Sequence, residues 1–238
     1  GPPAARPDLK RVQREGSFPL GIVGQQAWDA LTSEVEALQQ RAIDLLGGAF
    51  EPVMLEARTI EFANLRVRLS GAIRHLVQTS DGRRVLLLSR PGRIRAIDLA
   101  RLVLERALLG GDESGLEMWA IGLEAHAPKA IALKPADDLR NWIRDLLVWR
   151  ARGLQWPLPA FPKSAEKFAA SLISSGDRDR ARKAAQAAWS DDDWPESADP
   201  HHALVARHHA EAVHGELFER FAEALFLPLL AATEVIGR

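Results

Sequence analysis

The segment from Leu65 to Arg95 constrains the fold more than any other part of the chain. Apolar and polar residues alternate through its first half, and a second apolar run follows the turn-forming tripeptide Ser80-Asp81-Gly82. This pattern predicts two strands joined by a turn. Helical periodicity begins near Ile94, so we expect the second strand to lead into a helix.

The same segment is strongly basic. It holds one acid, Asp81, and eight arginines, at positions 66, 68, 74, 83, 84, 90, 93 and 95. A strand hairpin that runs into a helix is where one large class of nucleases keeps its metal-binding carboxylates. A divalent cation needs several oxygen ligands, so this hairpin cannot hold one by itself. The segment therefore indicates a nuclease-like scaffold without nuclease chemistry.

Composition adds only local signals. The 238-residue chain is 47% hydrophobic, enough for a real core, and its net charge of −1 gives no global attraction to nucleic acid. A separate stretch, residues 191 to 199, is acidic and holds no Lys or Arg; its acids are Asp191, Asp192, Asp193, Glu196 and Asp199. This asymmetry favours a basic face. The absence of cysteine excludes disulfides and thiolate metal sites and fits a reducing, cytoplasmic location.

Three parts are expected along the chain. Residues 1–24 form an N-terminal segment with a Gly- and Pro-rich loop, 25–153 an α/β core, and 154–238 a helical C-terminal extension. The Pro-rich opening, which lacks an initiator Met, favours a piece of a longer chain. In the core we expect helices at 25–46, 96–109 and 138–152 and strands at 60–62, 65–74, 85–88, 117–123 and 130–133. In the extension we expect helices near 164–174, 178–189, 201–213 and 215–230.

This order predicts an α/β (α+β) fold with a mixed sheet flanked by helices. Helix, three antiparallel strands, helix and strand is the core order of restriction-endonuclease-like folds, so we expect a degenerate PD-(D/E)xK core. Fold order alone is weak evidence of function.

The catalytic signature of that fold is missing from the expected strands. It needs an Asp on one strand and Asp/Glu-x-Lys on the next. Arg74 stands at the first position, after Gly71-Ala72-Ile73, and Leu87-Leu88-Ser89 stands at the second. The chain has one Asp/Glu-x-Lys, at Asp8-Leu9-Lys10, ahead of the first expected helix. We therefore expect no catalytic residues, no metal and no cofactor.

Histidines and tryptophans in the C-terminal half are further candidates for binding a metal or a partner protein. Five histidines lie between 201 and 214, but same-face pairs such as His201 and His208 are seven apart, too far for one metal, so a solvated or interface helix face is favoured. Trp142 and Trp149 are expected in the core. Trp189 and Trp194 lie in or beside loops, where they could anchor a protein interface.

The arginine hairpin has two interpretations. It could be a solvated strand face that blocks edge aggregation, or a surface that contacts phosphates or an acidic partner. By period-two alternation Arg66, Arg68 and Arg74 share one face, and Arg84 and Arg90 share a parity on the neighbouring strand. These five are the candidate contact residues.

Read in order, several segments resemble the RecC family, the gamma subunit of exodeoxyribonuclease V. They are Leu9-Lys10-Arg11 through Leu20-Gly21, Ile60-Glu61-Phe62 through Gly71, the helix from Asp98 to Leu109, Trp156-Pro157-Leu158-Pro159, Asp191-Asp192-Asp193 and the final helix to Leu230. The resemblance implies a C-terminal domain built like its partner's nuclease but without the active site. It also implies RecB-like and RecD-like partners, sequence-independent contact with duplex DNA, and no membrane.

The leading hypothesis is thus a non-catalytic scaffold and DNA-path domain of a RecBCD-type helicase–nuclease in double-strand break repair. A second is an active Mg²⁺ nuclease with displaced carboxylates, Asp191–Asp193 with Glu196. A third is a generic interaction module.

Overall fold

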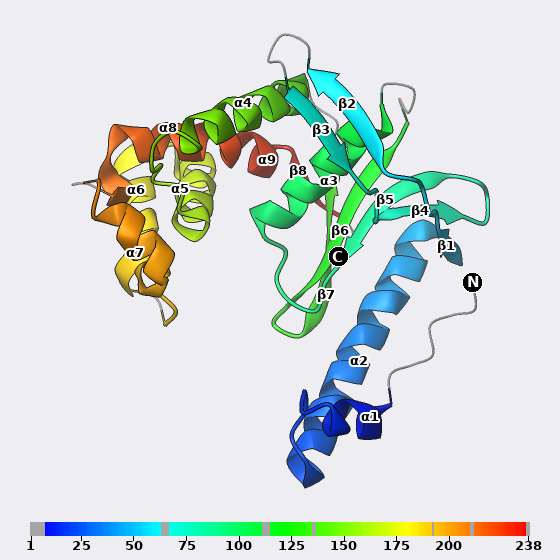
Figure 1. Cartoon of the computed structure of the whole chain (residues 1–238). Coiled ribbons are helices and arrows are strands. Elements are labelled where there is room, and N and C mark those ends of the chain that lie inside the picture. The colour runs from blue at the N-terminus through cyan, green and yellow to red at the C-terminus, as the bar shows by residue number, and fades with distance from the viewer. Residues whose placement is uncertain are drawn as a thin grey trace.

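A mixed β-sheet forms the centre of the molecule. The computed structural model describes residues 8–62, 67–110, 115–134, 137–191, 193–209 and 212–236. Within them the main sheet has six strands in the order β1-β4-β5-β6-β7-β8 (Figure 1). They are β1 (Phe50–Pro52), β4 (Leu76–Thr79), β5 (Arg84–Ser89), β6 (Glu117–Glu124), β7 (Ala127–Leu133) and β8 (Thr233–Ile236). The predicted mixed α/β class is confirmed.

Strands β5 and β6 run parallel, whereas the other neighbouring strands are antiparallel. Helix α3 (Ala96–Leu109) is the crossover between β5 and β6. Successive residues of a strand face opposite sides of the sheet. Accordingly, Leu86 and Leu88 belong to the apolar cluster of α3, and Val85 and Leu87 belong to the cluster of α2 (Gly21–Leu46). All four are buried, which confirms β5 as a central strand.

Helix α2 extends away from the sheet and carries α1 (Leu9–Arg14) near its far end (Figure 1). It begins at Gly21, so the loop predicted up to residue 24 is wrong at its end. The reason is close packing at Gly24, where an added Cβ would lie 1.8 Å from the carbonyl oxygen of Pro19. This glycine therefore permits a close helix contact and does not mark a chain bend.

The predicted continuous strand from Leu65 to Arg74 is also wrong. Strand β3 (Val67–Gly71) pairs with β2 (Arg58–Phe62) in a separate two-stranded sheet, and residues 72–75 link it to β4. Both β2 and β3 contact α3, and Leu108 of α3 lies beside Gly71. The chain has to leave this layer to reach the main sheet, which breaks the strand. The predicted turn at Ala63-Asn64 lies outside the described residues.

The helices after the core are α4 (Asp137–Gly153), α5 (Pro162–Ser175), α6 (Arg178–Gln186), α7 (Pro200–Ala206), α8 (Glu216–Leu225) and α9 (Leu227–Ala231). A π-helical turn, η2 (Ala187–Asp191), follows α6. The predicted helix 201–213 ends at Ala206, and the predicted helix 215–230 is divided at Phe226. Pro228 starts the second piece, because proline lacks a backbone donor and is tolerated in a first helical turn. Strand β8 was not predicted; it returns the chain to the sheet beside β7.

The C-terminal helices pack against the rest of the chain. The indole Nε1 of Trp142 in α4 donates to the carbonyl of Leu225 at 2.7 Å, and the Trp149 ring contacts Phe221 with centroids 5.5 Å apart. Phe168 of α5 and Phe218 of α8 are fully buried against each other. The apolar surface of the last helix is therefore covered largely by this chain itself.

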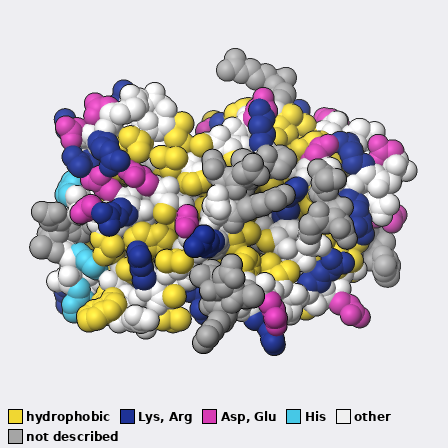
Figure 2. Space-filling model, turned by 90° about the horizontal axis from the view of Figure 1, so that it is seen from above, with side chains coloured by type: hydrophobic (Ala, Val, Ile, Leu, Met, Phe, Trp, Pro, Cys, Tyr) yellow, Lys and Arg dark blue, Asp and Glu magenta, His cyan; other side chains and the backbone are white. Residues whose placement is uncertain are grey.

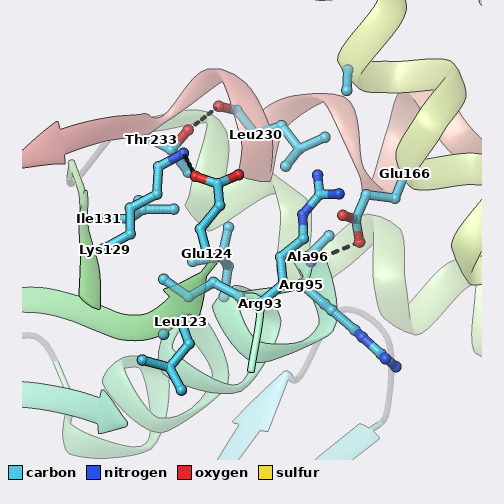
Figure 3. A pocket seen from close by; sticks show the side chains of 14 residues that line it. Arg93, Arg95, Ala96, Leu123, Glu124, Lys129, Ile131, Glu166, Leu230 and Thr233 are labelled. Atoms are coloured by element: carbon cyan, nitrogen blue, oxygen red, sulfur yellow. Dashed lines mark hydrogen bonds and ion pairs between the residues drawn. The ribbon is translucent and has the colours of Figure 1, made fainter. Parts of the chain in front are cut away.

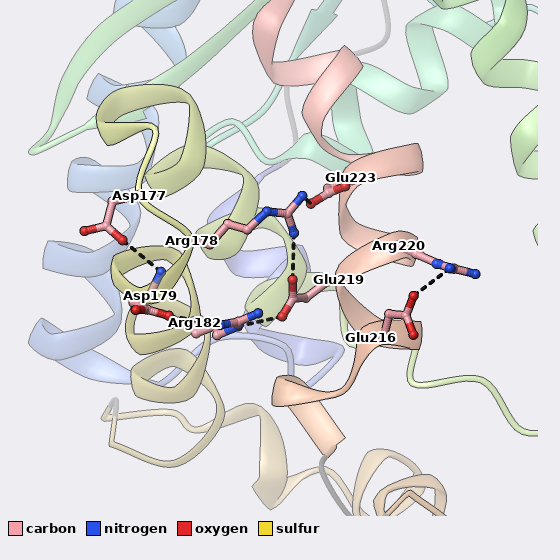
Figure 4. Close-up of polar contacts among 8 residues, drawn as sticks. All are labelled: Asp177, Arg178, Asp179, Arg182, Glu216, Glu219, Arg220 and Glu223. Carbon is pink, nitrogen blue, oxygen red and sulfur yellow. Dashed lines mark hydrogen bonds and ion pairs between the residues drawn. The ribbon is translucent and has the colours of Figure 1, made fainter.

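A charged network joins α6 to α8 (Figure 4). The buried carboxylate of Glu219 accepts from Arg178 Nη1 at 2.8 Å and from Arg182 Nε at 2.6 Å. Arg178 also reaches Glu223 at 2.7 Å. The hydrogen bond and charge of Glu219 raise the pKa of Arg182. These contacts fix the orientation of α6 relative to α8. Among the described helices, none is both long and apolar enough to cross a membrane.

Candidate nucleic-acid interface

The two positions expected to carry catalytic groups lie side by side. Leu87 N–H donates to the carbonyl of His75 at 2.7 Å, which extends the β4–β5 contact by one residue, to the neighbour of Arg74. Arg74 and Ser89 are exposed, whereas Leu88 is buried. The side chains at these positions are a guanidinium, a leucine and a hydroxyl, and the assignment of the positions to a nuclease-like site stays a prediction.

A carboxylate does lie next to this place, but it has another role. Glu105 of α3 is 8% exposed, and its Oε2 accepts the backbone N–H groups of Arg74 and His75 at 3.1 and 3.0 Å. Its Oε1 lies 2.7 Å from His75 Nδ1. Burial alone would raise the pKa of Glu105, but the hydrogen bonds and charge of His75 outweigh it, so the pKa lies below its ordinary value. Sequence reasoning missed Glu105, because its partners come from a strand break that period-two alternation does not reveal.

The five candidate arginines do not form one compact cluster. Arg68 projects from β3 and pairs across the small sheet with Glu61 at 3.1 Å, both groups being well exposed. Arg74 is exposed in the link between β3 and β4. Arg84 and Arg90 lie at opposite ends of β5, about 20 Å apart at 3.3 Å per residue. Arg66 lies outside the described residues.

Arg90 serves the fold directly. Its Nη1 donates to the buried carboxylate of Asp98 at 2.6 Å, and the same oxygen accepts the backbone N–H of Arg95 at 2.9 Å. Asp98 lies in the first turn of α3, where a negative charge is favoured. Arg90 therefore holds the start of α3 against the end of β5. A DNA phosphate would have to compete with Asp98 for this guanidinium.

Asp81, the single acid of the hairpin, shapes the turn between β4 and β5. Its carboxylate accepts from the Thr79 hydroxyl and from the backbone N–H of Arg83. These hydrogen bonds, with that of Thr79 the largest, lower the pKa of Asp81. Arg83 is itself engaged with Glu117 and lies over the Trp119 ring at 5.6 Å. Neither residue is available to a metal or to a phosphate without disturbing the turn.

A small pocket lies where β5 and β6 end and α3 begins (Figure 3). The carboxyl ends of parallel strands are a common ligand position in α/β proteins. The acids of this pocket are engaged: Glu166 accepts the N–H of Ala96 at 3.0 Å, and Glu124 pairs with Lys129 at 2.5 Å. The hydrogen bond and charge of Lys129 lower the pKa of Glu124. Two exposed arginines, Arg93 and Arg95, remain at this edge. Both are among the eight arginines of residues 65–95, but they were not candidate contact residues, because those were chosen by alternation along the predicted strands.

Comparison with protein families decides the relationship. The model of the RecC C-terminal domain matches residues 5–172, well over half of the chain. The chain belongs to the RecC C-terminal domain family. Membership confirms the predicted resemblance and gives this domain a subunit role in a RecBCD complex of DNA repair. No curated protein matches the chain.

The two tryptophans proposed as interface anchors differ in environment. In this RecC domain Trp189 is half-buried, and its ring packs on Phe161 with centroids 4.5 Å apart. Trp194 is 85% exposed, and its carbonyl accepts from Lys163 Nζ at 2.5 Å. Trp189 therefore belongs to the internal packing, whereas the Trp194 side chain is largely open to solvent.

The acidic loop of the RecC domain is partly structural. Glu196 is buried, and its two oxygens accept the backbone N–H groups of Lys163 and Ser164 at 2.9 and 2.7 Å, at the start of α5. Asp199 caps α7, and the N–H groups of His201 and His202 lower its pKa. Asp191 and Asp193 are exposed, and Asp192 lies outside the described residues. Glu196 is thus unsuited to the displaced metal site considered from sequence.

The remaining candidates have local roles. Asp8 caps α1 by accepting the N–H of Lys10 at 3.1 Å, so the Asp-Leu-Lys match is a helix start. Helix α7 ends before His208, so the histidines do not share one helix face; His209 Nε2 lies 2.9 Å from the Pro157 carbonyl. Within the described residues, no three His, Cys, Asp or Glu side chains gather in a metal-binding arrangement.

Proposed function

We propose that this RecC domain is a non-catalytic scaffold and DNA-path element of a RecBCD-type helicase–nuclease, built on a degenerate restriction-endonuclease-like core. One observation carries the proposal. Arg74 and Leu87-Leu88-Ser89 stand in the sequence at the positions where we expect the two carboxylates and the lysine of the nuclease signature, and both oxygens of nearby Glu105 are occupied. A site that activates water with Mg²⁺ needs free carboxylate oxygens.

Contact with duplex DNA is supported by the exposed arginines. Arg68, Arg74 and Arg84 are exposed, and Arg93 and Arg95 add cations at the end of β5. Arginine suits phosphate contact because its planar fork can donate two parallel hydrogen bonds. Such contacts position DNA without reading its sequence. The proposed DNA contacts are therefore spread over several elements and are indifferent to base sequence.

Docking of RecB-like and RecD-like subunits is supported by the exposed Trp194. A large exposed aromatic side chain on a loop is typical of an interface anchor, and Asp191 and Asp193 beside it favour a basic partner surface. A cytoplasmic location remains the expectation from composition.

A cleavage assay tests the absence of catalysis. The purified chain with Mg²⁺ or Mn²⁺ should leave linear duplex and single-stranded DNA intact. Metal-dependent cleavage that is lost in Asp192→Ala would instead establish the displaced-carboxylate nuclease. In that assay Asp8→Ala serves as a matched control, since Asp8 only caps a helix.

Copurification tests the scaffold role. The chain, expressed within its parent protein, should retain RecB-like and RecD-like subunits, and Trp194→Ala should weaken the retention of at least one of them. Failure of the wild-type protein to retain either subunit would refute the scaffold proposal.

A further inference from the structure

An apolar groove lies between the nuclease-like core and the C-terminal helices. Its volume is about 650 Å³, and its walls come from α3, α4, α8 and α9 and from the connector after α4. Trp142, Trp149, Phe221 and Phe226, all largely buried, are among the residues that line it. Volumes of this size are typical of binding sites, and nothing in the proposed function accounts for it.

The apolar surface of the groove extends to the solvent. Ile97 on α3 is 51% exposed and Leu154 in the connector is 73% exposed, and both line the groove. On α4 the lining residues recur at 142, 146, 149 and 153, the spacing of one helix face. Figure 2, the view from above, shows hydrophobic side chains reaching the surface among Lys and Arg side chains. A contiguous apolar surface of this kind marks a binding site.

Arginine side chains lie at and beside the groove. Among its described lining residues the one charged side chain is Arg150, which makes no ion pair with another described residue. Arg101 lies one helical turn after Ile97, is 61% exposed, and has only a distant contact with Asp98 at 4.0 Å. Arg152 lies over the Trp149 ring at 5.3 Å. The occupant should therefore carry negative charge beside its apolar face.

The walls also select the form of the occupant. They are mainly helices, whose backbone groups are satisfied within each helix, so they offer no edge to which an extended strand could pair. An amphipathic helix satisfies its own backbone and presents apolar anchors at i, i+3, i+4 and i+7. In a symmetric contact between two copies of this chain, the same groove with the same arginines would lie on both sides, and neither groove would supply acidic flanks to the other.

We propose that this groove binds an amphipathic helix of a partner subunit, with an apolar face flanked by acidic residues. The inference rests on the proposed scaffold function and names a second docking surface, separate from Trp194. Apolar side chains of the partner enter between α3 and α4, and its carboxylates pair with Arg101 and Arg150.

The test uses two labelled model peptides of about four helical turns, with leucines at helical spacing and either glutamates or lysines on the flanks. Fluorescence anisotropy with the full 238-residue chain should show the acidic peptide binding about tenfold or more tightly than the basic one. Ile97→Glu should abolish binding, and Arg101→Ala with Arg150→Ala should remove the preference for the acidic peptide.

Matched controls separate the groove from general surface effects. Val35→Glu changes an equally exposed apolar residue on α2, and Arg14→Ala with Arg144→Ala removes the same charge elsewhere, Arg144 lying on the opposite face of α4. Neither control should alter binding. Equal binding of both peptides, or binding unaffected by Ile97→Glu, would overturn the proposal. So would self-association of the wild-type chain that Ile97→Glu abolishes, since the occupant would then be a second copy.

The parent complex distinguishes this proposal from the scaffold function. If the wild-type protein retains its partner subunits and Ile97→Glu retains them equally, with no loss after a high-salt wash, the groove proposal fails and the scaffold function stands. If Ile97→Glu loses a partner subunit and Val35→Glu does not, the result supports both the groove proposal and the scaffold function.

Discussion

Glu105 on α3 lies 2.7 Å from the ring of His75, in the link that carries the chain from the small sheet to the main sheet. Its other oxygen accepts the backbone N–H groups of His75 and Arg74. Nearly buried, this one carboxylate holds the strand break that separates β3 from β4. Glu105 therefore acts as a structural clamp at this link.

Glu105→Gln should destabilise the fold at neutral pH by about 1–3 kcal/mol, because charge-assisted hydrogen bonds to a buried group are lost. The pKa of Glu105 is lowered in the folded protein. Its contribution is therefore complete above the ordinary pKa of a glutamate and disappears as the pH falls through the lowered value. Urea unfolding over a series of pH values should show a large difference between wild type and variant near neutral pH, and the difference should shrink as the pH falls through the lowered pKa of Glu105.

Glu61→Gln is the control for this measurement. Glu61 also pairs with a cation, Arg68, but both side chains are 68% exposed, and exposed pairs contribute little. Its removal should leave the free energy of unfolding nearly unchanged across the pH series. An equal effect of the two substitutions would show that the Glu105 clamp has no special role.

The strand break also explains where sequence reasoning succeeded and failed. Local periodicity placed α3 at residues 96–109 and β5 as a central strand, because the pattern of α3 comes from one buried face and that of β5 from burial on both faces. Local periodicity failed at Arg74, since the alternation of polar and apolar residues cannot show that the chain passes from the small sheet to the main sheet there. That step depends on Glu105, which lies about thirty residues away. The missed strand β8 is a similar case, because its pairing with β7 is a tertiary contact.

The sequence gives the residue types at the candidate site but not their contacts. The missing carboxylates at Arg74 and Leu87–Ser89 could be read from the sequence, because they follow from strand order. The engagement of Arg90 with Asp98 could not, since it depends on how α3 meets β5. The groove beside α4 was also hidden, because its walls come from helices distant in the chain.

Glu219→Gln should loosen the C-terminal helices. Glu219 is buried and accepts from both Arg178 and Arg182, so losing its charge should cost about 1–3 kcal/mol of unfolding free energy. Glu216→Gln, in an exposed pair with Arg220 on the same helix, is the matched control and should have no measurable effect. Hydrogen exchange should show faster opening of α6 and α8 in the first variant only. Identical exchange in the two variants would count against the network.

Trp189→Ala should lower the stability of the chain, whereas Trp194→Ala should weaken partner binding and leave stability nearly unchanged. Trp189 packs on buried Phe161, so its truncation should destabilise the chain by about 2–4 kcal/mol. Trp194 is 85% exposed, so its truncation should leave stability within about 0.5 kcal/mol and act only on partner binding. Thermal unfolding and subunit copurification measure the two effects. A destabilised Trp194→Ala, with partner binding intact, would remove the case for an interface anchor.

The exposed arginines should give the chain weak affinity for duplex DNA, indifferent to sequence and steeply dependent on salt, because phosphate contacts release counterions. Arg68→Gln with Arg74→Gln should lower the slope of log affinity against log salt by about 1–2, since each lost phosphate contact removes about 0.9. The fold should survive, because both side chains are exposed and the apolar partners Val67 and Leu69 are unchanged. Arg14→Gln with Arg144→Gln makes the same change in net charge away from the proposed path and should leave the slope unchanged. Equal slopes for the two double variants, or no binding of duplex DNA by the wild-type chain or its parent complex through this face, would leave these arginines as a charged, solvated surface.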